Sequence, residues 1–146
     1  MTTTETSTAR DWLAHADADP DRIYRWWESG AAALIALGRR FDVVRLDGAL
    51  AAWATQRLPD GPVMQLGSPE PRLYLLVPPG SWPRFSSPLA TLLGDTEYLA
   101  MNDPDATTNT GRPDIRWITP PDGTGRLVDP VELRRLVDSY APEQPR

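Results

Sequence analysis

The order of hydrophobic and polar positions along the chain predicts an α+β domain. Apolar residues recur every three or four positions, as on one face of a helix, over 19–30, 47–58 and 129–140. Short apolar runs bounded by glycine, proline or polar residues predict strands at 31–37, 41–46, 61–67, 72–80, 96–101 and 114–119. A further short helix is expected at 88–94. This order of elements favours a mostly antiparallel sheet packed on helices.

The first and last helices carry start signals. Asp19 is placed to cap the first helix, and Pro20 suits its first helical position. Asp129 and Pro130 repeat that pair, and Glu132 follows as in a capping box. The residues expected on the buried faces of the three helices are Ile23, Trp26 and Trp27, then Leu50, Trp53 and Ala54, then Leu133, Leu136, Val137 and Tyr140.

Length and composition indicate one domain. The chain has 146 residues, and we expect a single domain over 9–140 between disordered tails at 1–8 and 141–146. It has no cysteine, which excludes a disulfide framework and a thiolate metal site. No apolar run is long enough to span a membrane, and the N-terminus does not resemble a signal peptide. The expectation is a cytoplasmic protein without a membrane partner.

The charge of the chain limits what it binds. The formal net charge is −5, and all 15 basic residues are arginine, a preference that a GC-rich genome explains. Nucleic-acid binding through overall charge is disfavoured, but a local basic patch remains possible. Five arginines are close in sequence and interleaved with acidic residues, so a solvated face of mixed charge is favoured over a phosphate-binding face. They are Arg22, Arg25, Arg39, Arg40 and Arg45.

The usual chemical motifs do not occur. The sequence has no phosphate-binding P-loop, no GxGxxG and no zinc spacing. Its single histidine, His15, is expected on the surface rather than in a catalytic triad. A Mg²⁺ site built only of carboxylates stays open. The tryptophans at 26, 27, 53 and 117 suggest either a base-stacking platform or core packing, and their amphipathic segments favour the core.

The ordered series of segments resembles a known family. Residues 19–47, 61–80, 92–102 and 112–136 are similar in turn to successive segments of the bifunctional DNA primase/polymerase (prim-pol) N-terminal domain, most closely to its actinobacterial members. That family belongs to the archaeo-eukaryotic primase superfamily. The positions that match its pattern are Asp19-Pro20, Ile23, Trp26-Trp27, Gly38 and Val43-Val44. The resemblance covers about 10–140 and implies a prim-pol-like fold with a core related to RNA-recognition motifs.

The chain departs from the family where the chemistry is expected. In active members two carboxylates at alternate positions of one strand hold divalent metal. Here those positions are Arg45 and Asp47. The family's phosphate-contacting histidine corresponds to about Arg72, and its third acidic position falls near 89–91, which holds no carboxylate. Asp47 is then the remnant of a metal pair or, the favoured interpretation, the cap of the helix that follows.

Three functional hypotheses follow. The first is a catalytically inactive prim-pol-like domain, a pseudoenzyme that binds or regulates and needs no cofactor. Its relict nucleotide or nucleic-acid groove would be lined by Arg45, Asp47 and Arg72, with Arg39 and Arg40 at the entrance of the strand. The second is a residual Mg²⁺-dependent primase or nucleotidyltransferase using Asp47 with one further carboxylate, drawn from Asp114, Asp103 or Asp105. The third is a module that binds only protein.

Overall fold

The computed structural model describes residues 8–67, 71–81, 89–105 and 114–140, which form four helices and seven strands. In chain order they are α1 (Ala9–Ala14), α2 (Pro20–Glu28), β1 (Ala33–Ala36), β2 (Asp42–Asp47), α3 (Gly48–Ala54), β3 (Val63–Leu66), β4 (Arg72–Val77), β5 (Ala90–Leu93), β6 (Tyr98–Met101), β7 (Ile115–Thr119) and α4 (Pro130–Asp138). Residues 1–7 and 141–146 of the predicted tails lie outside the described residues, whereas Thr8 belongs to the fold, because its side chain caps α1.

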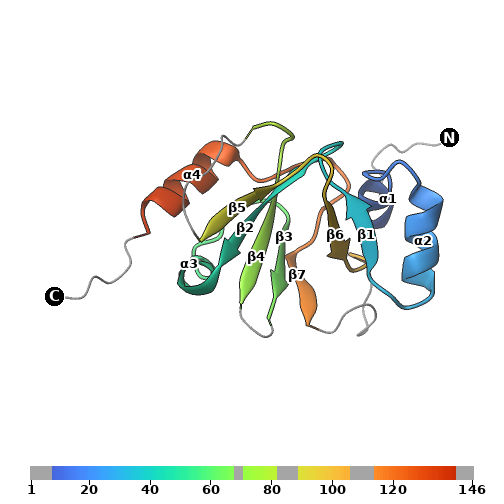
Figure 1. The fold of residues 1–146 in the computed structure, drawn as a ribbon, viewed down its shortest axis with the longest axis horizontal. Helices are drawn as coiled ribbons and strands as arrows, with labels where there is room; N and C mark the ends of the chain where they lie inside the picture. Colours follow the sequence, from blue (N-terminus) through green and yellow to red (C-terminus); the bar gives the residue numbers. More distant parts are fainter. Residues whose placement is uncertain (1–7, 68–70, 82–88, 106–113, 141–146) are drawn as a thin grey trace.

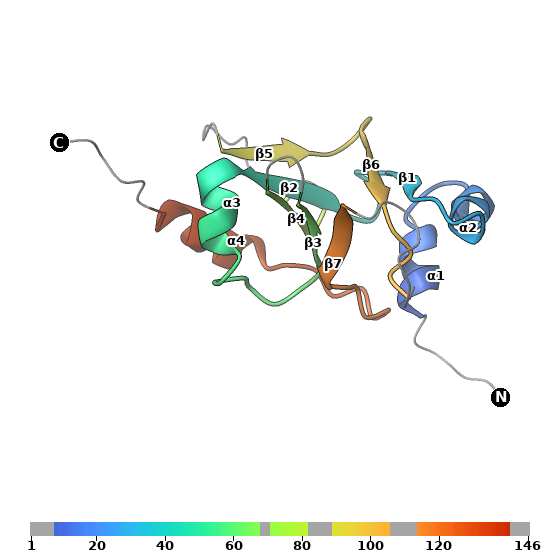
Figure 2. The ribbon, with the colours of Figure 1, turned by 90° about the horizontal axis from the view of Figure 1, so that it is seen from below.

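Five of the strands form one antiparallel sheet in the order β5-β2-β4-β3-β7, and β1 pairs with β6 in a second, two-stranded sheet. The predicted α+β class with a mostly antiparallel sheet is therefore confirmed. Helices α3 and α4 lie on one side of the large sheet, and α1, α2 and the small sheet lie on the other (Figures 1 and 2).

Two segments of the chain, β1-β2 and β5-β6, each contribute one strand to each sheet. Strand β2 follows β1 after a short turn, β6 follows β5, and the β1-β6 pair continues the direction of the β2-β5 pair. Gly38 lies in the turn with φ +93°, and a Cβ there would come within 2.7 Å of the Asp95 backbone. Only glycine combines that left-handed conformation with so close an approach. The bend turns the small sheet towards α1 and α2.

Alternation along the strands fills two separate cores. On one face of β2 and β4, Val43 and Leu76 pack with residues of α1, α2 and β1. On the opposite face, Val44 and Leu75 pack with α3 and α4. Side chains of a strand point alternately to its two faces, so the apolar run of β2 serves both cores.

Two elements differ from the sequence-based expectation. The segment 88–94 was expected to hold a short helix, but Ala90–Leu93 form β5 and pair with β2. An apolar run of this length has no periodicity that separates a strand from a helix, so strand pairing decides. Helix α1 was not predicted. It buries Trp12, whose ring stacks on Phe41 with centroids 5.7 Å apart.

The predicted caps of α2 and α4 are confirmed, and the residues expected on the inner faces of the helices pack against the two cores, except Trp26. Asp19 accepts a hydrogen bond from the Arg22 amide, and Asp129 accepts one from Val131. Trp26 was expected to be buried, but its side chain is exposed while Trp27 is buried. Trp27 donates from its indole nitrogen to the Met101 carbonyl oxygen, at 3.0 Å. None of the helices in the described part of the chain has the length and apolar character needed to cross a membrane.

Candidate anion-binding site

Arg45, Asp47 and Arg72 come together on one face of the large sheet; we call them the β2-β4 cluster. Arg45 and Asp47 are two positions apart in β2, so their side chains leave the same face. Arg72 is the residue of β4 directly opposite Asp47. Side chains of directly opposed residues on antiparallel strands are close neighbours. Strand register alone therefore places two guanidinium groups around one carboxylate.

The contacts within the β2-β4 cluster all end on the Asp47 carboxylate. Arg45 Nε lies 3.0 Å from Oδ1, and Arg45 Nη2 donates a hydrogen bond to Oδ2 at 3.2 Å. Arg72 Nε lies 3.3 Å from Oδ1. Arg45 and Asp47 thus form an ion pair within β2. Two positive groups and one negative group leave the cluster with one net positive charge.

Asp47 does not cap the helix that follows it. It occupies the N-cap position of α3, but its side chain makes no capping hydrogen bond. The two arginines hold the carboxylate on the sheet face instead. The chain turns from β2 into α3 at Gly48, which has φ +54°, a conformation that glycine adopts without strain. The cap interpretation favoured from the sequence is wrong, because ion pairing directs the side chain elsewhere.

The β2-β4 cluster is partly open to solvent. The exposed fractions of the side chains are 27% for Arg45, 21% for Asp47 and 43% for Arg72. Opposite Arg45 on β4 is the buried Tyr74, which belongs to the core formed with α1 and α2. Opposite it on β5 is Thr91. The cluster thus sits where the covered part of this sheet face ends, with its guanidinium groups within reach of a dissolved ligand.

Arg39 and Arg40, which the sequence placed in the same site, lie at the opposite end of β2. The strand is about 17 Å long at roughly 3.3 Å per residue, and these arginines precede its first residue. Arg40 Nη1 donates to the Trp12 carbonyl oxygen at 3.0 Å, and its guanidinium lies over the Trp12 ring. Arg39 Nη1 reaches the Ala16 carbonyl oxygen at 3.5 Å. They attach α1 and the loop after it to the sheet.

The carboxylates considered for a metal site lie apart. Asp114 precedes β7, at the far edge of the sheet from β2, which is about 14 Å away at three strand spacings. Asp103 Oδ2 accepts a hydrogen bond from Arg10 Nε at 2.9 Å in a different part of the molecule. Over the described ranges, no group of three or more His, Cys, Asp or Glu side chains is placed to hold a metal ion. The Asp47 carboxylate contacts two guanidinium groups, and their positive charge would repel a divalent cation.

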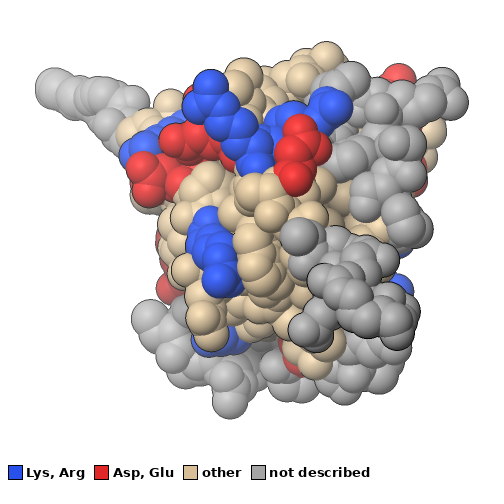
Figure 3. Space-filling model, turned by 90° about the vertical axis from the view of Figure 1, so that its left-hand side faces the viewer, with Lys and Arg blue, Asp and Glu red and all other residues tan. Residues whose placement is uncertain are grey.

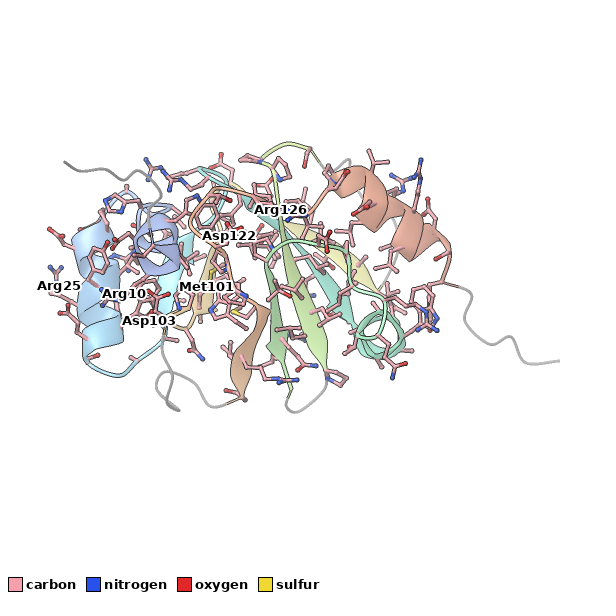
Figure 4. All side chains as sticks on the ribbon, turned by 180° about the vertical axis from the view of Figure 1, so that it is seen from behind. Arg10, Arg25, Met101, Asp103, Asp122 and Arg126 are labelled. Atoms are coloured by element: carbon pink, nitrogen blue, oxygen red, sulfur yellow. The ribbon has the colours of Figure 1, made fainter. Side chains whose placement is uncertain are left out.

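A second charged cluster, which the sequence did not reveal, joins α1 to α2 and to the end of β6. The guanidinium of Arg10 lies over the rings of Tyr24 and Trp27, at 4.9 and 5.7 Å, and pairs with Asp103 (Figure 4). The Tyr24 hydroxyl donates to Asp11 Oδ1 at 2.6 Å. Burial, together with this bond, raises the pKa of Tyr24 to about 12. No sequence motif marks this cluster, because its members come from three separate elements.

The hydrogen bond from Tyr24 also changes the pKa of Asp11, and burial changes the pKa of Asp105. The Tyr24 hydroxyl holds the pKa of Asp11 below its ordinary value. Burial and the nearby Asp103 carboxylate raise the pKa of Asp105 above the ordinary value. An open hollow of about 540 Å³ adjoins these groups, and it is lined by both acidic and basic side chains. Its mixed charge gives it no clear preference for an anion or a cation.

The arginines of the predicted mixed-charge face do not share one surface: Arg22 pairs with Asp17 and Arg45 with Asp47, while Arg39 and Arg40 donate to backbone carbonyl oxygens. Other parts of the surface carry charges of both signs. On the face that Figure 3 shows, arginines and carboxylates adjoin one another. A hollow of about 590 Å³ between α4 and the loop after α3 is also lined by residues of both signs, including Arg57, Asp60, Glu132 and Arg135. His15 is exposed, as predicted. The β2-β4 cluster differs from these surfaces because its cations outnumber its carboxylate.

Comparison with protein-family models, with curated proteins and with solved structures finds no match to this chain. The chemistry of the β2-β4 cluster is thus the basis for a functional proposal.

Proposed function

We propose that this chain is a catalytically inactive, prim-pol-like binding or regulatory domain that recognises a phosphate group of a nucleotide or nucleic acid. The observation that carries the proposal is the β2-β4 cluster itself. Where the prim-pol pattern has a pair of carboxylates, the strand carries Arg45 and Asp47, and Arg72 faces them from β4. The resemblance suggests the ligand, and the two guanidinium groups supply the chemistry to bind it.

Arginine suits this role physically. Its planar guanidinium presents several N–H donors in a fixed arrangement that matches the oxygens of a phosphate. The β2-β4 register fixes the separation of the backbone positions that carry the two arginines, which limits the ordering required when a ligand binds. Because the overall net charge is −5, binding here is expected to depend on local geometry rather than on attraction by the whole protein.

The proposal is tested by isothermal titration of the full chain at low salt, with ATP and with a short single-stranded oligodeoxynucleotide as separate ligands. We expect saturable binding of at least one of them, weakened at least tenfold by Arg72→Gln, which corresponds to about 1.4 kcal/mol. Arg126→Gln is the matched control, because Arg126 is exposed and pairs with the exposed Asp60 on another surface. Absence of binding to both ligands at low salt, where electrostatic attraction is strongest, would favour the protein-only hypothesis.

The residual-enzyme hypothesis makes a different prediction in the same samples. It requires nucleotide incorporation that depends on Mg²⁺ or Mn²⁺ and that Asp47→Ala abolishes. Our proposal expects no incorporation by either protein under conditions in which an active primase extends a template. Metal-dependent incorporation that is lost in Asp47→Ala would replace the binding role with a catalytic one.

A further inference from the structure

We infer that Asp47 is an internal competitor for the anion, so that the β2-β4 cluster binds phosphate without a divalent metal and Asp47 lowers its affinity. This inference rests on the proposed function and specifies how the same site works. It reverses the role that a metal-binding remnant would have. A metal-binding Asp47 would be required for the ligand, whereas a competing Asp47 opposes it.

The first support is that the Asp47 side chain contacts only the two arginines among the described residues. Its carboxylate does not cap α3, and its contacts within the described residues are with Arg45 and Arg72. In contrast, Asp17 accepts hydrogen bonds from the backbone amides of Asp19 and Ala36 as well as from Arg22. A carboxylate that holds backbone groups cannot leave without a large cost, but a carboxylate that holds only two side chains can exchange them for another anion.

The second support is the imperfect geometry of the ion pairs. Arg45 Nε and Asp47 Oδ1 are shielded from solvent and 3.0 Å apart, yet neither atom has a hydrogen-bond partner of adequate geometry. Only the contact from Arg45 Nη2 to Oδ2 is an aligned hydrogen bond. A guanidinium has five N–H donors, so most donors of Arg45 and Arg72 are not engaged by Asp47. A phosphate group, with more acceptor oxygens than a carboxylate, can engage both arginines at once.

The third support is the sign of the local charge. A divalent cation bound to the Asp47 carboxylate would lie within a few ångströms of two guanidinium groups, and like charges at that distance repel strongly where solvent is partly excluded. An anion is attracted by the same two groups. Binding of a phosphate therefore does not need Mg²⁺, and a ligand whose phosphates are already neutralised by Mg²⁺ is expected to bind less well.

The test compares wild type with Asp47→Asn by isothermal titration, with ATP and with the oligodeoxynucleotide, in EDTA and in Mg²⁺. Asparagine keeps the size of the side chain and removes its charge. We expect Asp47→Asn to bind about tenfold more tightly in EDTA, the factor that corresponds to losing one competing charge-assisted contact. The ligand that gains affinity identifies the source of the phosphate. Asp60→Asn makes the same change of charge on an exposed surface and should leave affinity unchanged.

The outcomes separate this inference from the proposed function. Binding that requires Mg²⁺ and disappears in Asp47→Asn would overturn the inference, because Asp47 would then hold metal, while a ligand-binding role would stand. Equal affinity of wild type and Asp47→Asn in EDTA would also overturn it. No binding by either protein in any condition would overturn the proposed function as well. Circular dichroism and a second variant, Asp47→Ser, show whether any loss of binding comes from misfolding.

Discussion

Two pairs of the same chemical type, Arg22 with Asp17 and Arg45 with Asp47, have nearly equal distances but different surroundings. Their shortest contacts are 2.9 and 3.0 Å. The Asp17 side chain is only 5% exposed, whereas that of Asp47 is 21% exposed. The distance between the charged atoms therefore does not determine whether an ion pair is structural. The partners of the carboxylate and its access to water decide whether the pair is structural or exchangeable.

The pair at Asp17 completes the open edge of β1. Asp17 Oδ2 accepts a hydrogen bond from the Ala36 amide at 3.0 Å, and Arg22 Nη2 donates to the Leu34 carbonyl oxygen at 3.2 Å. These are the groups that a neighbouring strand would otherwise bond. An unpaired strand edge is a site for unwanted pairing with other chains. The pair thus takes the place of a strand, and the loop between α1 and α2 is fixed to the small sheet.

The largest expected effect is on stability at the structural pair. Asp17→Ala should lower the free energy of unfolding by about 3 kcal/mol, because it leaves two backbone amides and the Arg22 guanidinium without their acceptor. Urea denaturation measures the change. Asp21→Ala, an exposed acid on the same segment, is the control and should cost well under about 1 kcal/mol. Equal losses in the two variants would contradict the structural role of Asp17.

Titration of Asp17 should also make the free energy of unfolding depend on pH. Burial disfavours the charged form of Asp17, but hydrogen bonds from the Asp19 and Ala36 amides and the charge of Arg22 hold its pKa below the ordinary 3.8. A carboxyl group whose pKa is lower in the folded state stabilises the fold above the unfolded-state pKa. This contribution is lost as the pH falls below about 4 and through the folded-state pKa. Urea denaturation at a series of pH values measures the free energy of unfolding of wild type and of Asp17→Asn. If Asp17 is the source, the difference between the two should shrink as the pH falls below about 4.

At the exchangeable pair the expected effect on stability is smaller. Asp47→Asn should change the free energy of unfolding by less than about 1 kcal/mol, because both arginines reach water when the carboxylate charge is removed. A double-mutant cycle of Asp47→Asn with Arg45→Gln should give a coupling energy below that of Asp17→Asn with Arg22→Gln. If the coupling at Asp47 were the larger, this carboxylate would be structural and the internal-competitor inference would lose its main support.

The smallest effect is expected at a third pair, between Arg126 and Asp60. Its atoms are 3.2 Å apart, close to the distance in the other two pairs, but the Asp60 side chain is 84% exposed. Asp60→Asn should change stability by no more than about 0.5 kcal/mol. A graded series from Asp17 through Asp47 to Asp60, measured in one buffer, would establish that burial and backbone partners order these pairs. A large effect at Asp60 would break that order.

The elements with strong local signals could be predicted from the sequence alone. Capping residues and proline mark the starts of α2 and α4, and apolar runs mark the strands from β1 to β4, with β6 and β7. The presence of Arg45 and Asp47 on one face also follows from the sequence, because strand geometry fixes alternate residues to the same side. The position of Arg72 relative to Asp47 came from the resemblance and agrees with the β2-β4 register.

The features that depend on contacts between distant segments could not be predicted from local signals and became visible in the fold. The strand at Ala90–Leu93 exists because β2 has an edge to pair with, and the burial of Trp27 rather than Trp26 depends on which side of α2 meets Met101. The roles of Asp17 and Asp47 could not be distinguished from their sequence, since both are aspartates near arginines. What separates them is the set of donors that folding places around each carboxylate, and those donors come from elements that are far apart along the chain.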